Sequence, residues 1–379
     1  MKHISHLLPS RKLHRARCAV LGAAAALGMI RCWPALAQER FIIEYPLPRP
    51  DLRPGQIVLG PDGALWFTET GPGVDARVGR ISASGTISEF SLPGQAPLPS
   101  SLVAGRDGAL WVATLRTHEI VRLETTGATT SFGLPYCPRT NGVVLATGAD
   151  GNIWFTTATC GTIDRLTTLG QITEFPLPTA STPAPMSITS GYDGALWFLD
   201  HQNRTIGRMT MNGSVSWFSV PFGGVMNGLT SGPDQAIWIT RTTGPTADLL
   251  RLDSHGNTRS YPLPSPAFST LASIVTGSDE ALWFTEWNGN KVGRLDAVGS
   301  LTWLDVPTPN AYPAGIAVGP EGDIWFTESI GNRIGHIVGS GRTAVAVPAA
   351  SAAALAVLAV ALMAGSLLVL TQARRASRT

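Results

Sequence analysis

The sequence lacks the short motifs that mark several common enzyme classes. It contains no G-x-x-x-x-G-K-[ST] phosphate-binding loop, no G-x-S-x-G turn and no C-x-x-C pair. These absences argue against a P-loop nucleotide hydrolase, a serine hydrolase with a nucleophile elbow and a dithiol redox protein. The four histidines beyond residue 37, which are His118, His201, His255 and His336, do not have the spacing of metal ligands.

Charged residues are also scarce, and they are unevenly distributed. They make up 14% of the 379 residues, with a formal net charge of +2. Residues 1–37 carry six basic side chains and the last nine residues carry three, and neither end has an acidic residue. Residues 38–342 therefore hold 19 basic and 26 acidic residues, a net charge of −7. Because phosphate backbones are bound through basic patches, we expect no nucleic-acid partner.

Residues 1–37 have the features of a signal peptide. Basic residues precede the apolar run Ala19–Ile30, and Ala35-Leu36-Ala37 forms an A-x-A-like cleavage site before Gln38. Arg31 directly follows the apolar run and is atypical there. An uncleaved membrane anchor is therefore the alternative to a cleaved signal.

Residues 343–379 have the pattern of a transmembrane or sorting segment. The stretch Ala349–Leu370 is uncharged and long enough to cross a bilayer as a helix, and the arginines that follow it should stay cytoplasmic. The order Val347-Pro348, apolar helix, Arg374-Arg375 resembles the C-terminal sorting signals of Gram-negative bacteria, the PEP-CTERM and IPTL-CTERM types. A plain membrane anchor is the alternative. Both predict an exported protein, periplasmic or at the cell surface, which is either anchored in the membrane through the C-terminal helix or sorted through the C-terminal segment.

Between these ends, one phrase recurs seven times. It consists of an apolar strand, a turn resembling Gly-Pro-Asp-Gly and a strand centred on tryptophan. The tryptophans are Trp66, Trp111, Trp154, Trp197, Trp238, Trp283 and Trp325, at spacings of 45, 43, 43, 41, 45 and 42 residues. A period in the low forties with short strands is typical of a β-propeller with one four-stranded blade per repeat. The sequence therefore predicts an all-β, seven-bladed propeller over residues 38–342.

The last repeat shows how the ring closes. Ile316–Val318 is its predicted strand A, Ile324–Glu328 its strand B and Arg333–Ile337 its strand C, but no strand D follows. Residues Phe41–Leu47 form a strand D with no blade before it. We expect this N-terminal strand to complete blade seven, which removes an open sheet edge.

Two periodic features are expected to be structural. The tryptophans should pack between blades rather than form a carbohydrate platform. An arginine recurs on strand C and should pair with a carboxylate of the same or the adjacent blade. These arginines are Arg80, Arg122, Arg165, Arg208, Arg251 and Arg294.

Only two of the four cysteines lie outside the predicted signal peptide. Cys137 is in the connection that enters blade three, and Cys160 is in the loop between strands B and C of the same blade. Both loop types emerge on one face of a propeller, and an exported protein can keep a disulfide. We expect a Cys137–Cys160 disulfide, with two free buried thiols as the alternative.

Three phrases carry a resemblance to a known family. They are D-G-A-L-W-F-T-E at Asp62–Glu69, R-V-G-R-I at Arg77–Ile81 and I-T-E-F-P-L-P at Ile172–Pro178. With these phrases the chain resembles the virginiamycin B lyase (streptogramin lyase) family over residues 40–340. The resemblance implies a seven-bladed propeller and a Mg²⁺-dependent lyase that opens the ester-closed ring of streptogramin B antibiotics by elimination.

The residues that the family uses for this chemistry are missing. The resemblance implies a Pro-His-x-Ile phrase at the start of strand A in the last two blades, one histidine as base and the other against the substrate, with two glutamates on the metal. The histidine positions read Ala272 and Ala314, and the glutamate positions read Tyr312 and Ser329. The other blades carry no histidine there, but Gln56 or its neighbours, Ser101, Asn141, Met186 and Asn227. Alanine cannot accept a proton, so we expect no cleavage by the family route.

Other polar residues should gather on the same face, where strand A begins and strand B ends around the central channel. The strand-B ends are Glu69, Thr114, Thr157, Asp200, Arg241, Glu286 and Glu328. Of these, Glu69, Asp200, Arg241, Glu286 and Glu328 are the candidate ligand residues at the channel mouth, and Glu286 and Glu328 could hold Mg²⁺ or Ca²⁺. Alternatively, these groups only bond the neighbouring backbone.

Asp200 and His201 are the catalytic candidates. An aspartate beside a histidine could serve as a base or a metal ligand. Adjacent residues at a strand end point apart, however, so a solvated loop histidine is the alternative.

Two functions from different classes remain. In the first, the protein is an exported, monomeric propeller that binds an unknown small molecule or surface partner without the family's chemistry. In the second, it is a metal-dependent lyase or a lactone-type hydrolase with a relocated site. The missing histidines favour the first, and the acidic strand-B ends keep the second open.

Overall fold

The structure, a computed structural model, describes residues 40–72, 77–94, 98–135, 142–178, 183–220, 223–264 and 269–341. They belong to one of two compact units of the chain, Arg40–Thr379, and the other unit, Met1–Glu39, lies outside the described residues. In the described part every regular element is a strand, and no helix there could cross a membrane. The predicted signal peptide (1–37) and C-terminal segment (343–379) lie outside these residues and stay predictions.

The strands group into seven four-stranded sheets in the predicted order. Blade one contains β2 (Pro54–Leu59), β3 (Leu65–Glu69), β4 (Arg77–Ile81) and β5 (Ile87–Ser91), and blade two contains β6 (Pro99–Ala104), β7 (Leu110–Thr114), β8 (Glu119–Leu123) and β9 (Thr129–Gly133). Blade three contains β10 (Leu145–Thr147), β11 (Ile153–Thr157), β12 (Thr162–Leu166) and β13 (Ile172–Pro176), and blade four contains β14 (Pro185–Ser190), β15 (Leu196–Asp200), β16 (Thr205–Met209) and β17 (Val215–Ser219).

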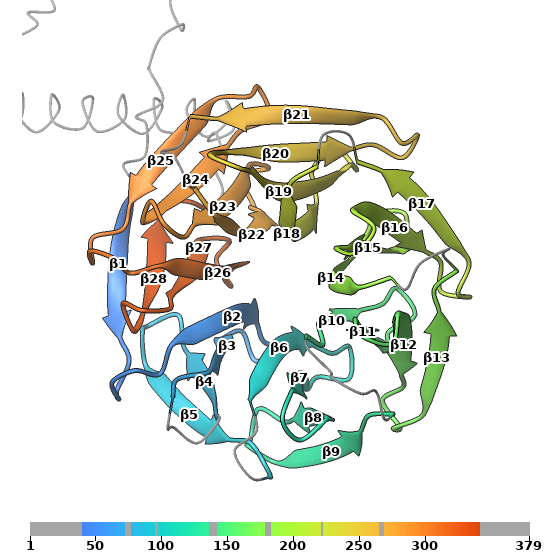
Figure 1. Cartoon of the computed structure of the whole chain (residues 1–379). Coiled ribbons are helices and arrows are strands. Elements are labelled where there is room, and N and C mark those ends of the chain that lie inside the picture. Colours follow the sequence, from blue (N-terminus) through green and yellow to red (C-terminus); the bar gives the residue numbers. More distant parts are fainter. Residues whose placement is uncertain are drawn as a thin grey trace, which may run out of the picture. The chain divides into compact units, whose positions relative to one another are not determined.

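The remaining blades follow the same rule until the last. Blade five contains β18 (Val225–Ser231), β19 (Ile237–Thr243), β20 (Thr246–Leu252) and β21 (Thr258–Leu263), and blade six contains β22 (Leu271–Thr276), β23 (Leu282–Glu286), β24 (Lys291–Leu295) and β25 (Leu301–Asp305). Blade seven combines β26 (Pro313–Val318), β27 (Ile324–Glu328) and β28 (Arg333–Val338) with β1 (Phe41–Pro46). Figure 1 shows the sheets arranged radially, with the first strand of each repeat innermost.

The N-terminal strand closes the ring, as predicted. β1 pairs antiparallel with β28, with Phe41 opposite Val338 and Tyr45 opposite Ile334. The chain after β1 is held by blade seven as well, because the side-chain oxygen of Asn332 accepts the Leu52 N–H at 2.8 Å and its amide donates to the Arg49 carbonyl at 2.7 Å. The two ends of the propeller are thus joined by a sheet ladder and by side-chain hydrogen bonds.

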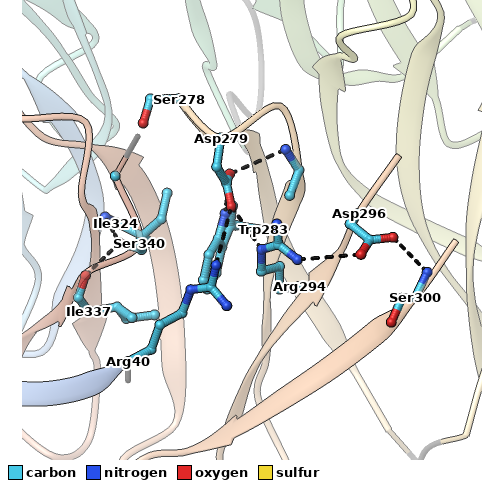
Figure 2. Close-up of polar contacts among 12 residues, drawn as sticks. Arg40, Ser278, Asp279, Trp283, Arg294, Asp296, Ser300, Ile324, Ile337 and Ser340 are labelled. Atoms are coloured by element: carbon cyan, nitrogen blue, oxygen red, sulfur yellow. Dashed lines mark hydrogen bonds and ion pairs between the residues drawn. The ribbon is translucent and has the colours of Figure 1, made fainter. Parts of the chain in front are cut away.

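Each repeated tryptophan is buried, and in blades one to six its indole N–H donates to an aspartate near the surface. In blade six, Trp283 donates its indole N–H to Asp279 at 3.0 Å, and Arg294 Nε donates to the other carboxylate oxygen at 2.8 Å (Figure 2). Arg40, just before β1, reaches the same carboxylate at 3.9 Å. Five blades share this arginine–aspartate pair, with Nε–oxygen distances of 2.5–2.8 Å. The predicted pairing with a carboxylate is thereby confirmed for five of the six arginines, whereas Arg165 in blade three lies over the Trp154 ring and donates to the Thr173 hydroxyl at 3.5 Å.

Two further features of the repeat are the glycine that follows strand A and, in blade seven, a histidine at the strand-C position that carries arginine in the other blades. A side chain at Gly277, where strand A ends, would come within 2.7 Å of the Trp283 ring, so the indole needs glycine there. In blade seven, His336 takes the place of the arginine. It stacks on Trp325 at 4.0 Å between ring centroids, and its Nε2 lies 3.1 Å from Asp323.

Candidate ligand-binding face

The two positions at which the family resemblance implies histidines lie at irregular points of the innermost strands. In β22 the register with β23 shifts between Leu271 and Ile274, so that Ala272 lies in a bulge. β26 has the same shift between Pro313 and Ile316, which places Ala314 in a bulge. Bulges re-aim side chains and often lie beside functional sites. Both positions therefore lie at bulges of the innermost strands, each with only a methyl group.

Threonine hydroxyls fix the backbone at these bulges. Thr285 accepts the Ser273 N–H at 3.1 Å and donates to the Ala314 carbonyl at 2.6 Å. In the next blade Thr327 accepts the Gly315 N–H at 2.8 Å and donates to the Gly55 carbonyl at 2.7 Å. Each threonine thus ties the bulge of its own blade to the innermost strand of the next, and the backbone of the site is rigidly held.

The two positions at which the family resemblance implies glutamates are Tyr312 and Ser329 in this chain. Ser329 donates its backbone N–H to the Tyr312 carbonyl at 3.1 Å, so the two positions are adjacent. The Tyr312 ring meets Trp287 edge-on, with centroids 5.8 Å apart. A phenol and an alcohol supply no carboxylate, and Mg²⁺ is normally bound through carboxylates. The residues present at this place do not fit the family's metal.

The strand registers also show which residue of each other blade is equivalent to Ala272. The register places Gly55 and Ser100, rather than Gln56 and Ser101, at the position equivalent to Ala272. In blade three the pairing of Leu145 with Phe155 places Val143 there, and Asn141 lies outside the described residues. Met186 and Asn227 keep their predicted positions. The correction leaves the conclusion unchanged, because none of these residues is a histidine.

The seven strand-B ends are buried between the blades. Glu69, Thr114, Asp200, Glu286 and Glu328 are 0% exposed, and Arg241 and Thr157 are 4% and 8% exposed. None of them lines the central cavity, which has a volume of about 470 Å³ and is bounded by the innermost strands. The described residues contain no group of three His, Cys, Asp or Glu side chains that could hold a metal ion. A ligand role for these residues stays a prediction.

Two of the carboxylates serve the local backbone, as the alternative expected. Asp200 accepts hydrogen bonds from the backbone of Ala184, Gln202 and Asn203 at 2.9–3.2 Å, and from the Asn203 amide at 2.6 Å. Glu286 accepts from the Ser269 hydroxyl at 2.8 Å and from the Gly289 N–H at 3.0 Å. These bonds hold the loops between strands B and C.

Glu69 and Glu328 differ, because neither accepts a hydrogen bond within the described part of the chain. Burial, with the nearby Glu89, raises the pKa of Glu69 to about 7, although Arg49 and Arg77 oppose the shift. Burial and the nearby Glu44 raise the pKa of Glu328 to about 8 against the opposing charge of Arg333. Both side chains should therefore hold a proton at or near neutral pH, which disfavours metal binding.

Arg241 is neutralised by a residue that the sequence did not single out. Asp248 pairs with it in a buried, two-pronged salt bridge, with distances of 2.8 Å to Nε and 2.5 Å to a terminal nitrogen. Asp248 lies directly opposite Arg241 in the β19–β20 ladder. The sequence could have predicted this pair, because Trp238 lies opposite Arg251 in the ladder and counting three residues along each strand places Arg241 opposite Asp248.

His201 lines a cavity that the sequence did not predict. The cavity lies between blades four and five and has a volume of about 320 Å³. Its lining residues are His201, Arg204, Gly224, Val225, Met226, Thr242 and Gly244. Asp200 and His201, the two catalytic candidates, have different surroundings. Asp200 is 0% exposed and is hydrogen-bonded within the loop. His201 alone reaches the cavity.

Cys160 is part of a disulfide in the structure. Its predicted partner, Cys137, lies outside the described residues. The Cys137–Cys160 pairing therefore stays a prediction.

This fold and this face define a closed seven-bladed propeller with bulged inner strands beside a central channel. The model of the virginiamycin B lyase family matches residues 35–184 and 179–366. The chain therefore belongs to the virginiamycin B lyase family. A comparison with curated protein sequences gives no match.

Solved structures agree with this assignment. A streptogramin B lyase structure is 31% identical, with a TM-score of 0.72 over 79% of this chain and 97% of that chain. A catalytically inactive histidine-to-alanine variant of virginiamycin B lyase from Staphylococcus aureus, with quinupristin, is 31% identical with a TM-score of 0.72 over 79% of this chain and 99% of that chain. The WD40 propeller of Doa1, at 15% identity and a TM-score of 0.61 over 79% of this chain and 98% of that chain, shows the fold alone.

Proposed function

We propose that this protein is an exported propeller of the virginiamycin B lyase family that binds a ligand or partner on its channel face without the family's elimination chemistry. The observation that carries the proposal is the pair Ala272 and Ala314 at the bulged starts of β22 and β26. Elimination requires a group that removes a proton from carbon, and a methyl group cannot do so. Tyr312 and Ser329 also replace the carboxylates expected for Mg²⁺.

A relative supports the separation of binding from catalysis. The Staphylococcus aureus lyase in which one histidine is alanine is catalytically inactive, and it was crystallised with quinupristin. This chain carries alanine naturally at both expected histidine positions. By analogy, its channel face could accept a cyclic peptide antibiotic and release it unchanged.

Binding to quinupristin is measured by calorimetry on the full chain in detergent, followed by mass spectrometry of the recovered compound. The proposal predicts saturable binding and recovery of the intact ring. Replacing Ala314 with a bulky tryptophan should block binding, whereas Arg106→Gln, on an exposed turn of blade two, should leave it unchanged. Binding that is insensitive to Ala314→Trp would place the compound elsewhere and reject the channel face.

The export part of the proposal rests on the signal-like residues 1–37 and the apolar segment 343–379. A fusion of alkaline phosphatase after residue 341 tests it, because that enzyme needs the oxidising periplasm to form its disulfides. High phosphatase activity that disappears when residues 1–37 are removed is the expected result. An inactive fusion that accumulates in the cytoplasm would contradict export.

One observation favours the second function, a lyase or lactone-type hydrolase with a relocated site. His201 is a histidine beside a cavity on the same face as Ala272 and Ala314. Its pKa is lowered by burial, against the Met226 backbone and the charge of Asp200, so the ring is neutral and able to act as a base at pH 7. Turnover of an ester or lactone that is lost in His201→Gln would support this function.

A further inference from the structure

The cavity between blades four and five is separate from the family's site. It is formed by the loop after β15, the start of β18 and the turn after β19. None of its lining residues belongs to blade six or seven, where Ala272 and Ala314 lie. Its volume of about 320 Å³ is at the lower end of the range for ligand sites in proteins.

The charge of the cavity is positive. Among the described lining residues Arg204, which is exposed, is the charged one, and none is acidic. Arg204 has no ion pair or hydrogen bond within the described part of the chain. The nearest carboxylate in sequence, Asp200, is 0% exposed and is bonded to the loop backbone and to Asn203. An unpaired guanidinium in such a place favours a carboxylate ligand, with which it can form two parallel hydrogen bonds.

His201 adds a hydrogen-bonding group to the wall. Its backbone is fixed, because its N–H donates to the Ala184 carbonyl at 3.1 Å. The ring Nε2 is shielded from water and has no hydrogen-bond partner in the described residues. When Nδ1 donates to a carbonyl, Nε2 of a neutral imidazole is left as an acceptor. A ligand that brings an N–H or O–H to the ring would satisfy this buried atom.

The rest of the wall is apolar or open. Val225 is 57% exposed, which is unusual for a large apolar side chain at the start of a strand. Met226 beside it is buried, and methionine adapts readily to the shape of a ligand. Gly224 and Gly244 have φ values of 105° and 65°, so both positions favour glycine and leave the space clear of side chains.

From these features we infer that the cavity binds a small carboxylate that has an apolar body and one hydrogen-bond donor, such as an N-acyl amino acid. The carboxylate contacts Arg204, the donor reaches His201 Nε2 and the apolar body covers Val225 and Met226. The inference does not depend on the function proposed for the channel face, because the two places share no residue.

N-acetyl-leucine is the probe, and N-acetyl-leucinamide, which lacks the carboxylate, is the matched control. Calorimetry on the full chain in detergent should give a dissociation constant on the order of 1 mM or tighter for the acid. The amide should bind at least about tenfold more weakly, the equivalent of about 1.4 kcal/mol. In histidine-labelled protein the acid should shift the ring resonances of His201, identified with a His201→Gln variant, and not those of His255 on an exposed turn.

Variants at the surface keep the test independent of folding. Arg204→Gln and Val225→Glu should each weaken binding at least about tenfold, and Val225→Gln, which has the same size without the charge, should weaken it less. Arg106→Gln should have no effect. Thermal melts establish that each variant is folded. No detectable binding of the acid, equal binding of the amide, or full affinity in Arg204→Gln would each overturn the inference.

Discussion

At the scale of single residues, the buried carboxyls decide how the stability of the propeller depends on pH. Glu328 is 0% exposed and accepts no hydrogen bond in the described residues. Its pKa is raised to about 8 by burial and by Glu44, with Arg333 opposing. The folded protein therefore keeps this proton up to about pH 8, whereas the unfolded chain loses it near pH 4.5. Between these values the unfolded state binds fewer protons, so stability must fall as pH rises.

A Glu328→Gln variant tests this directly. Glutamine cannot ionise, so at pH 9 the variant should be more stable than the wild type by on the order of 3 kcal/mol. At pH 4.5 the two proteins should be nearly equal. Urea unfolding at both pH values gives the comparison, and Glu321→Gln, on an exposed turn, is the control. Equal stabilities of the variant and the wild type at pH 9 would show that Glu328 is not held in an unfavourable charged state.

The state of the buried carboxyls Glu286 and Glu328 also predicts how the melting temperature responds to divalent cations. Glu286 is bonded to Ser269 and Gly289, and Glu328 holds its proton near neutral pH. We therefore expect no rise in melting temperature on adding Mg²⁺ or Ca²⁺ at pH 7, and no fall with EDTA. A bound ion at a hundredfold excess over its dissociation constant would add about 2.7 kcal/mol of stability, a clear shift. Such a shift, if abolished in Glu286→Gln, would restore these residues as a metal site.

Single residues are also where prediction from the sequence was weakest. The strand-B ends were expected to be ligand residues around the channel mouth; in the structure their side chains are at most 8% exposed, and their ligand role stays a prediction. Alternation along a strand tells which face of the sheet a side chain occupies, yet in a propeller both faces are covered by neighbouring blades. The cavity at His201 arises from contacts between the loops of two blades, which one repeat cannot reveal.

At the scale of elements, the repeat predicted almost every strand. Strand B of blade seven was expected at Ile324–Glu328 and is found there, because tryptophan, the turn and the apolar alternation all agree. The starts of strand A were misplaced by one residue in blade two and by two residues in blade three, whereas Gly55 in blade one is a neighbour of the expected Gln56. A bulge sets two residues opposite one, and nothing in the local composition marks where that extra residue lies.

The closing strand is the element whose loss should cost most. Removing residues 40–48 leaves the edge of β28 unpaired and takes away the contact of Arg40 with Asp279. We expect the truncated protein to melt earlier and to form oligomers through the open edge. Size-exclusion chromatography with light scattering measures the oligomers, and Phe41→Ser, at an exposed position of the intact strand, is the control. A truncated protein that stays monomeric with an unchanged melting temperature would contradict closure by β1.

The loops of blade three make a separate prediction. Cys160 is in a disulfide, and we expect Cys137 to be the other half. Peptide mapping of the unreduced protein should recover a peptide that joins the two cysteines, and this peptide should be lost after reduction. A Cys137→Ser variant should expose one reactive thiol at Cys160. Reactivity of both cysteines in unreduced, denatured wild type would reject the pair.

At the scale of the whole molecule, the chain keeps the scaffold of a lyase family, and we propose that it lacks the family's reactive groups. The tryptophan repeat was enough to predict seven blades and their closure, because every local signal points to the same fold. The function could not be predicted to the same depth. Repeat residues build blades, and the positions that carry chemistry are few and can change without disturbing the fold.

The central claim is that the propeller has lost the family's elimination. The most direct measurement is mass spectrometry of quinupristin incubated with the purified protein and Mg²⁺ at pH 7. We predict an intact ring with the wild type. A variant with the four family residues restored, Ala272→His, Ala314→His, Tyr312→Glu and Ser329→Glu, should open it. Opening by the wild type at about 1 s⁻¹ or faster, a rate usual for enzymes, would contradict the claim and point to another base in this chain.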